Sequence, residues 1–268
     1  MLLLTGEDAV DDIQRVTRSN MVDGVLLLDV VEDDDRVAQV GSYDKPCVAI
    51  GYPADRGDCA CVDIDFAAAG ALAMDYLYER GHRDVLLLRD NERDYERRSG
   101  YVVALRRHML DRAHELGMRI VESGKNEAGH FDAAAFVRDL KAMNPRPTAI
   151  VNQAEAAVMN MVVQELADAG IGVPNDVSLL SVGTFFENDL VRRPITEIPV
   201  MPKLLCAKAV GLLLSAVEDG RRISASGELV PPVVQDHGTV ATVIPSGASD
   251  SDATGPLPPH ISPRKSQA

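Results

Sequence analysis

Histidines, cysteines and clustered aspartates are the residues of this chain that could support catalysis or metal binding. The histidines are scattered: His82 follows a helix-ending glycine, while His108 and His114 lie along a charged helical stretch. We expect each of these three to be a solvated or capping residue rather than a catalytic base. The run Asp33–Asp35 has the charge of a cation site but lacks the spacing and the closing glutamate of a calcium loop. A solvated helix start, stabilised by the helix dipole, is the interpretation that its sequence favours.

The cysteines form no metal-binding pattern. Cys59 and Cys61 are two residues apart in a strand-like segment, so both thiols should lie on one face of the strand. No further ligands follow at the spacing that a zinc site requires, and we expect structural burial. Together with Cys47 and Cys206 they do not make the dense framework of disulfides found in small secreted domains. We therefore expect neither a metal nor a cofactor.

Charge and motif content exclude several functional classes. The sequence has no G-x-S-x-G elbow, no Walker phosphate loop, no H-E-x-x-H motif and no G-x-G-x-x-G loop after a strand. The net charge of -14 repels phosphate backbones, so the charge of this sequence does not favour binding to nucleic acid. No apolar run reaches the roughly 18 residues that a membrane span needs, and residues 1–4 are too few for a signal peptide. We expect a cytoplasmic protein that is not an enzyme.

Short β-branched runs alternate with helical patterns along most of the chain, which is typical of parallel α/β units. The length of 268 residues suits two lobes of ordinary size. We expect strands at 2–4, 25–28, 47–50, 60–64, 85–88, 119–121, 149–151, 177–182 and 229–235. We expect helices at 7–20, 33–40, 66–80, 95–116, 131–143, 155–169 and 203–218. Beyond them the chain is rich in Ser, Gly, Pro and Asp, which predicts a disordered tail.

Several segments occur in an order and at a spacing that point to one protein family. The most specific are 145–150, Pro-Arg-Pro-Thr-Ala-Ile, and 173–178, Val-Pro-Asn-Asp-Val-Ser. The stretch 76–85 contains Glu-Arg-Gly-His-Arg, and 97–105 reads Arg-Arg-Ser-Gly-Tyr followed by Ala-Leu. Further matches lie at 22–27, 45–50, 193–196 and 237–241. The set resembles the effector-binding core of the lactose-repressor (LacI/GalR) family over about residues 1–241.

The resemblance implies an α/β fold with two doubly wound parallel-sheet lobes of the periplasmic-binding-protein type, which close on a small molecule. It assigns residues 1–82 plus 199–241 to the amino-terminal lobe, 83–198 to the carboxy-terminal lobe and 242–268 to the tail. Chain crossings are expected near 81–83, 195–201 and 229–234. In such sheets, ligands bind beyond the carboxyl ends of the strands. Closure of a homodimer then changes how its paired headpieces sit on operator DNA.

The front of the chain departs from the family pattern. The helix-turn-helix headpiece is missing, and so are the first strand and first helix of the amino-terminal lobe, because residues 2–4 correspond to the second strand. In a sheet ordered 2-1-3-4-5 the first strand is central, so its loss leaves unpaired backbone groups in mid-sheet. We therefore expect Met1 to be an internal start in a longer protein. Operator DNA would be contacted only through the missing headpiece.

The resemblance also implies a set of effector-binding residues. Arg97 stands at the family's ligand-contacting arginine, and Phe131 lies near an aromatic ring that is often stacked on the ligand. A surface salt bridge for the first and a core role for the second remain open. Asp44 and Asn152 are weaker candidates at strand ends. Glu155 stands in the Asn-Asp position that follows the family's Pro-Thr-Ala-Ile strand.

Two observations weaken the expectation of an ordinary sugar effector. Gly183 stands where the family commonly has a carboxylate that binds sugar hydroxyls. The chain has no tryptophan and only 4% aromatic residues, which does not favour a stacking-rich pocket. We expect the sensing and dimerisation core of a transcription regulator whose effector is a sugar or another metabolite. Two alternatives stay open: an extracytoplasmic solute-binding protein, which would need an export signal, and a degenerate dimerisation module without a ligand.

Overall fold

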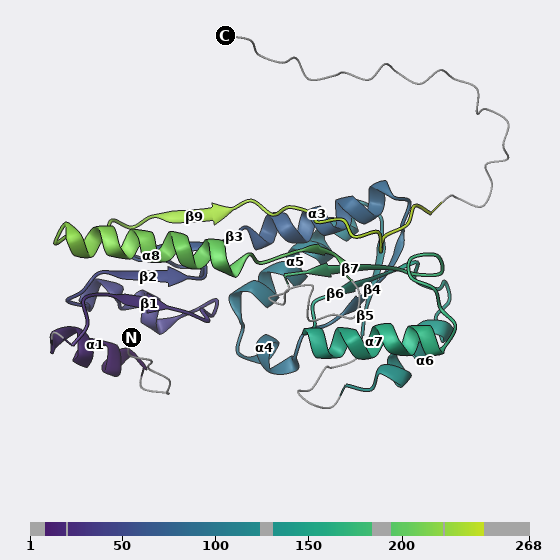
Figure 1. Cartoon of the computed structure of the whole chain (residues 1–268), viewed down its shortest axis with the longest axis horizontal. Coiled ribbons are helices and arrows are strands. Elements are labelled where there is room, and N and C mark those ends of the chain that lie inside the picture. Colours follow the sequence, from purple (N-terminus) through teal and green to yellow (C-terminus); the bar gives the residue numbers. More distant parts are fainter. Residues whose placement is uncertain (1–8, 20, 124–130, 184–193, 222, 244–268) are drawn as a thin grey trace, which may run out of the picture.

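The computed structural model describes residues 9–19, 21–123, 131–183, 194–221 and 223–243, which form two α/β lobes side by side along the long axis of the molecule (Figure 1). Both sheets are parallel, which confirms the fold class predicted from the sequence. The expected strand at 2–4 and nearly all of the expected tail lie outside the described residues. In the described ranges, no helix is long and apolar enough to cross a membrane.

The first lobe is a four-stranded sheet in the order β1-β2-β3-β9, with helices on both faces. α8 packs across β1, β2 and β3 on one face. On the other face Cys47, Cys59 and Cys61 are buried beside side chains from α1 and α2. This confirms the structural burial expected for Cys59 and Cys61. The elements are β1 (Val25–Leu27), β2 (Cys47–Ile50), β3 (Ala60–Ile64), β9 (Gly227–Val230), α1 (Ala9–Arg18), α2 (Asp35–Ala38), the short 3-10 helix η1 (Val40–Ser42) and α8 (Pro202–Glu218).

The second lobe is a five-stranded sheet in the order β5-β4-β6-β7-β8. Alternate residues of its buried strands face opposite layers: Leu87 and Val151 pack with α3 and α5, while Leu86 and Ile150 pack with α6 and α7. These two pairs of helices cover opposite faces of the sheet (Figure 1). The strands are β4 (Asp84–Leu88), β5 (Arg119–Glu122), β6 (Ala149–Asn152), β7 (Ser178–Val182) and β8 (Thr196–Ile198). The helices are α3 (Phe66–Glu79), α4 (Glu92–Glu96), α5 (Gly100–Glu115), α6 (Ala133–Ala142) and α7 (Ala156–Asp168).

One apolar core is continuous between the lobes. It joins Val62 and Leu205 of the first lobe to Ala73, Leu105 and Leu180 of the second. The chain passes between the sheets after β3, after β8 and after β9. All three passages therefore border the same buried cluster, which holds this side of the interlobe junction together.

The first passage lies earlier in the chain than the boundary expected after residue 82. α3 packs against α5 and β7, so the whole helix belongs to the second lobe and the passage falls at Asp65. The third passage lies where it was expected, between Val230 and Gln235, but the residues after it had been assigned to the first lobe. Gln235 pairs with Glu197, and the amide of Ala241 donates to Ser178 Oγ at 2.9 Å. Residues 235–243 consequently pack on the second lobe rather than the first.

Three element predictions were wrong. The single helix expected at 95–116 is two helices, α4 and α5, because Arg98 has a left-handed φ of 55° and the chain turns there toward the other lobe. The strand β8 was missed, since its three residues carry no alternating pattern. The last strand begins at Gly227 and ends at Val230 instead of running from 229 to 235.

Two polar residues expected at solvated or capping positions are buried. His82 is 1% exposed, and its ring nitrogens contact Thr148 Oγ1 at 2.8 Å and the Ala241 carbonyl at 3.0 Å. Burial lowers its pKa, so the neutral ring ties the returning segment to the second lobe. Asp34 caps α2 through the amide of Arg36 and is also buried.

Gly183 has a backbone position that no side chain fits. Its φ is 69°, and a Cβ there would lie 2.2 Å from Cδ1 of the fully buried Leu105. A side chain therefore could not enter here without displacing the core between α5 and β7.

We expect Gly183→Ala to lower the free energy of unfolding by about 2–4 kcal/mol, through left-handed strain and overpacking against Leu105. Gly117→Ala is the matched control, because Gly117 has a φ of 66° with open space around it. That control should cost only about 1 kcal/mol, from strain alone. Urea denaturation of both variants measures the difference, and equal losses would contradict the steric argument.

Candidate functional site

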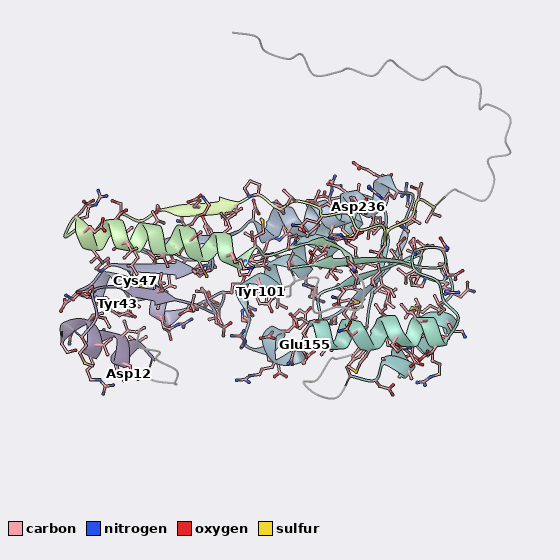
Figure 2. The ribbon with its side chains drawn as sticks, viewed as in Figure 1. Asp12, Tyr43, Cys47, Tyr101, Glu155 and Asp236 are labelled. Carbon is pink, nitrogen blue, oxygen red and sulfur yellow. The ribbon has the colours of Figure 1, made fainter. Side chains whose placement is uncertain are left out.

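A cavity of about 370 Å³ lies between the lobes at the carboxyl ends of β1, β2 and β3. Its walls come from the segments that follow these strands, from the stretch joining α4 to α5, and from the first turns of α8. Tyr101, at the start of α5, is seen where the two lobes meet (Figure 2). The apolar part of the lining is Leu28, Val30, Ile50, Val200, Pro202 and Leu205.

Asp63 is the most deeply buried charged side chain of the cavity wall. It lies on the same face of β3 as Cys61 and is 7% exposed. Its Oδ1 accepts a hydrogen bond from the Ile64 amide at 2.8 Å. Among the described residues, no cation and no side-chain donor contacts it. Burial raises the pKa of Asp63 to about 7, although backbone hydrogen bonds from Ile64 and Tyr52 act to lower it.

Three aromatic side chains line the same cavity: Tyr52, Phe66 and Tyr101. The rings of Phe66 and Tyr101 have centroids 5.9 Å apart and are tilted by 47°. One face of the Tyr52 ring is covered by the Arg56 guanidinium, 4.8 Å from its centroid. The low aromatic content of the whole chain therefore conceals a local concentration of rings at the cavity.

Arg97 forms an ion pair that crosses from one lobe to the other. Its Nη1 and Nη2 donate to the two carboxylate oxygens of Asp29 at 2.7 and 2.6 Å. Its Nε donates to Asp94 at 2.7 Å. We call residues 29–32 of the first lobe and 97–100 of the second the interlobe latch.

The rest of the latch combines charge and backbone pairing. The Glu32 carboxylate pairs with Arg98, and Arg107 lies 3.5 Å from it. The Glu32 amide donates to the Arg98 carbonyl at 2.9 Å, and the Gly100 amide donates to the Val30 carbonyl at 3.2 Å. The lobes thus touch through the shared core on one side of the cavity and through the latch on another.

Backbone strain is concentrated at the same junction. Among the described residues, the non-glycine positions with positive φ are Asp29 at 56°, Arg98 at 55° and Met201 at 55°. The first two belong to the latch, and Met201 lies on the passage into α8. Each left-handed residue costs on the order of 1–2 kcal/mol, so tertiary contacts between the lobes must stabilise these conformations.

Behind the cavity, polar groups meet at the carboxyl ends of β4 and β6. The Tyr101 hydroxyl donates to Asp90 at 3.0 Å, and burial raises the pKa of Asp90 to about 6. The Tyr95 hydroxyl donates to Gln153 Oε1 at 2.9 Å, while Nε2 of Gln153 is buried with no partner among the described residues. In the described ranges, no group of three or more His, Cys, Asp or Glu side chains is placed to hold a metal ion. The cavity lining offers a ligand carboxylates, one guanidinium, aromatic rings, a hydroxyl, a thiol and apolar side chains.

The structure places the predicted site residues at different points. Arg97 lines the cavity. Asn152 is fully buried at the end of β6, where its side chain bonds to the Ala154 backbone and to Ser181 Oγ within the second lobe. Glu155 is exposed at the start of α7 (Figure 2).

The other two predicted residues lie away from the cavity lining. Phe131 is half-buried, with its ring 5.8 Å from that of Phe136 in the core beneath the second sheet. Asp44 precedes the amino end of β2, next to Tyr43, which lies with Cys47 toward the far end of the first lobe (Figure 2). It is therefore at the opposite end of the strand from the cavity.

Sequence reasoning missed Asp63, Tyr52, Phe66 and Cys206, all of which line the cavity. Three of them carried a usable signal, because they lie at or just beyond the last residues of β2 and β3, where ligands of parallel sheets bind. Cys206 carried none, since it approaches the site only through the placement of α8.

The periplasmic binding protein-like domain is the family whose sequence pattern matches residues 74–239, more than half of the chain. The chain belongs to this family. The curated relatives that the chain matches are HTH-type transcription regulators, and a LacI family regulator is among its structural neighbours, so the resemblance to LacI-type regulators is confirmed.

The HTH-type transcriptional regulator RafR of Escherichia coli is 28% identical over 158 residues, 56% of this chain and 44% of the relative. The HTH-type transcriptional repressor PurR of Vibrio parahaemolyticus is 25% identical over 229 residues, 83% of this chain and 66% of the relative. The chain thus spans less than two thirds of these relatives.

A solved structure of a LacI family transcriptional regulator from Bifidobacterium animalis has the same fold. It superposes with a TM-score of 0.76 at 22% identity and covers 90% of this chain and 86% of that one.

Asp29→Asn should loosen the latch without unfolding the protein. The pair with Arg97 is largely exposed, so we expect a loss of about 0.5–1 kcal/mol in the free energy of unfolding. Because the pair joins the two lobes, the radius of gyration from small-angle scattering should also increase. Asp12→Asn is the control, since Asp12 pairs with Arg15 at the same 2.6 Å within one helix. An unchanged radius in both variants would show that the shared core alone sets the interlobe angle.

Asp63→Asn should stabilise the protein more at high pH than at low pH. The pKa of Asp63 rises from 3.8 to about 7 on folding, so its proton adds stability below this range, and that stability is lost as pH rises through 7. Asparagine keeps an oxygen for the Ile64 amide but does not titrate. Between about pH 5 and pH 8 the difference in unfolding free energy should move in the variant's favour by on the order of 2 kcal/mol. Urea melts at both pH values measure it, and a constant difference would contradict the raised pKa.

Proposed function

We propose that this chain is the small-molecule-sensing and dimerising core of a LacI-type transcription regulator. The observation that carries the proposal is the cavity whose walls come from both lobes, in a chain whose relatives are transcription regulators. A ligand that contacts both walls is sensitive to the angle between the lobes, and its binding energy can shift that angle. Such a core acts by binding and not by catalysis.

The remaining parts of the proposal follow from this role. The core works in the cytoplasm as a homodimer, and operator DNA is contacted by a helix-turn-helix headpiece outside these 268 residues. Arg97 is the residue through which an effector would act on the latch, since its side chain lines the cavity and also bonds to Asp29. A bound effector would either strengthen or replace that bond. Asn152 and Glu155 lie at and just beyond the carboxyl end of β6 in the second lobe, and we propose them as secondary effector-binding residues.

One observation favours a second function, a dimerisation module that has lost sensing. The guanidinium of Arg97 already donates from all three of its nitrogens to Asp29 and Asp94. In such a module the latch would hold the lobes permanently and no effector would bind.

The proposed role can be tested by gel shift on the promoter region of the gene. We expect the protein extended through the in-frame codons upstream of Met1 to retard this DNA, and the 268-residue chain with its net charge of -14 to leave it free. Sedimentation of the extended protein should show a dimer. An extended protein that is monomeric and binds no DNA would contradict the regulator role.

A further inference from the structure

The charges around the cavity do not balance. Its charged lining consists of three carboxylates and one guanidinium: Asp29, Asp63, Asp94 and Arg97. Arg97 is engaged by Asp29 and Asp94, which also partly neutralises those two carboxylates. Asp63 keeps no cation among the described residues and is 7% exposed. Burying a carboxylate without a cationic partner lowers the stability of the fold. The position of Asp63 in the cavity wall therefore suggests a binding role.

We propose that the effector sensed by this core carries a protonated amine, which pairs with the Asp63 carboxylate in the interlobe cavity. This inference rests on the proposed function and names the chemical class of the ligand. The amine would supply a positive charge that none of the described residues places against Asp63, and the ion pair would form in a place from which water is largely excluded.

The surroundings of Asp63 suit an amine attached to an apolar body. Phe66 and Tyr101 line the same cavity, and ring faces attract cations within about 6 Å of the ring centre. Leu28, Ile50 and Leu205 offer apolar contact to the rest of the molecule. A volume of about 370 Å³ is at the small end of ligand sites and fits a compact metabolite.

Other charge types fit the cavity less well. An anionic effector would meet the carboxylate of Asp63, while the guanidinium of Arg97 is already bonded on its Nε, Nη1 and Nη2 atoms. A neutral polyol can donate hydrogen bonds to Asp63 but leaves its charge uncompensated. Burial raises the pKa of Asp63, and a bound ammonium group would lower it again. The charge of the cavity lining therefore favours a cationic ligand over an anionic or neutral one.

The test is calorimetry of the purified chain with primary amines, each beside the hydroxyl compound of the same skeleton. Suitable pairs are glucosamine and glucose, putrescine and butanediol, and tyramine and tyrosol. We expect at least one amine to bind, and its hydroxyl partner to bind at least tenfold more weakly. Asp63→Asn should reduce the amine affinity at least tenfold and leave the hydroxyl compound unaffected. Asp111→Asn makes the same chemical change on the exposed face of α5 and should alter neither.

Each other result has a definite meaning. Equal or tighter binding of a hydroxyl compound, or an amine affinity that survives Asp63→Asn, would overturn the amine proposal and leave the sensing function in place. Silence of every amine and every hydroxyl compound would count against sensing itself and favour the dimerisation module. A loss of amine binding in Asp63→Asn is attributed to the carboxylate only if the variant melts in a single cooperative transition, as the pH experiment on the same variant also requires.

Discussion

The bidentate pair between Arg97 and Asp29 ties the two walls of the cavity to each other across the lobes. The lobes meet in two regions, and the cavity lies between them. On one side the shared core around Leu105 and Leu205 is apolar and continuous, so it holds the lobes together without fixing a direction. On the other side the latch is polar, directional and largely exposed, and each of its ion pairs is worth little alone. The latch is consequently the weaker of the two contacts between the lobes.

Two charged side chains of one cavity are treated in opposite ways by the fold. Arg97 bonds to carboxylates from both lobes, so its charge is neutralised within the protein and helps to hold the walls in place. Asp63 is held by a strand among buried neighbours and, from the described part of the chain, receives only backbone hydrogen bonds. The first residue therefore shapes the cavity, and the second gives it a preference for one sign of charge.

Much of the fold was predictable because it depends on local periodicity. β2 and β3 were located to the residue, and α3 and α7 to within one residue at each end, since buried strands and amphipathic helices each have a clear repeat. The break between α4 and α5 was not predictable. It depends on Glu32 and Val30, which meet Arg98 and Gly100 only after the lobes have assembled.

The site shows the same division. Arg97 could be found from its motif, but its saturation by Asp29 depends on a residue distant in the sequence. Strand alternation placed Cys59 and Cys61 on one face, and Asp63 continues that face. What alternation could not reveal is that this carboxylate lines a cavity and, among the described residues, contacts no cation there. The boundary at residue 82 failed for a related reason, because a helix that follows the first sheet packs on the second.

The distribution of the four thiols has a practical consequence. Cys47, Cys59 and Cys61 are buried beneath the first sheet, whereas Cys206 is exposed and belongs to the cavity wall. A maleimide dye added to the native protein will therefore react at one position, at the rim of the junction between the lobes. A dye attached there lies beside both walls of the cavity, so any change in the interlobe angle would alter its surroundings, and the unmodified sequence already contains a single position for such an optical reporter.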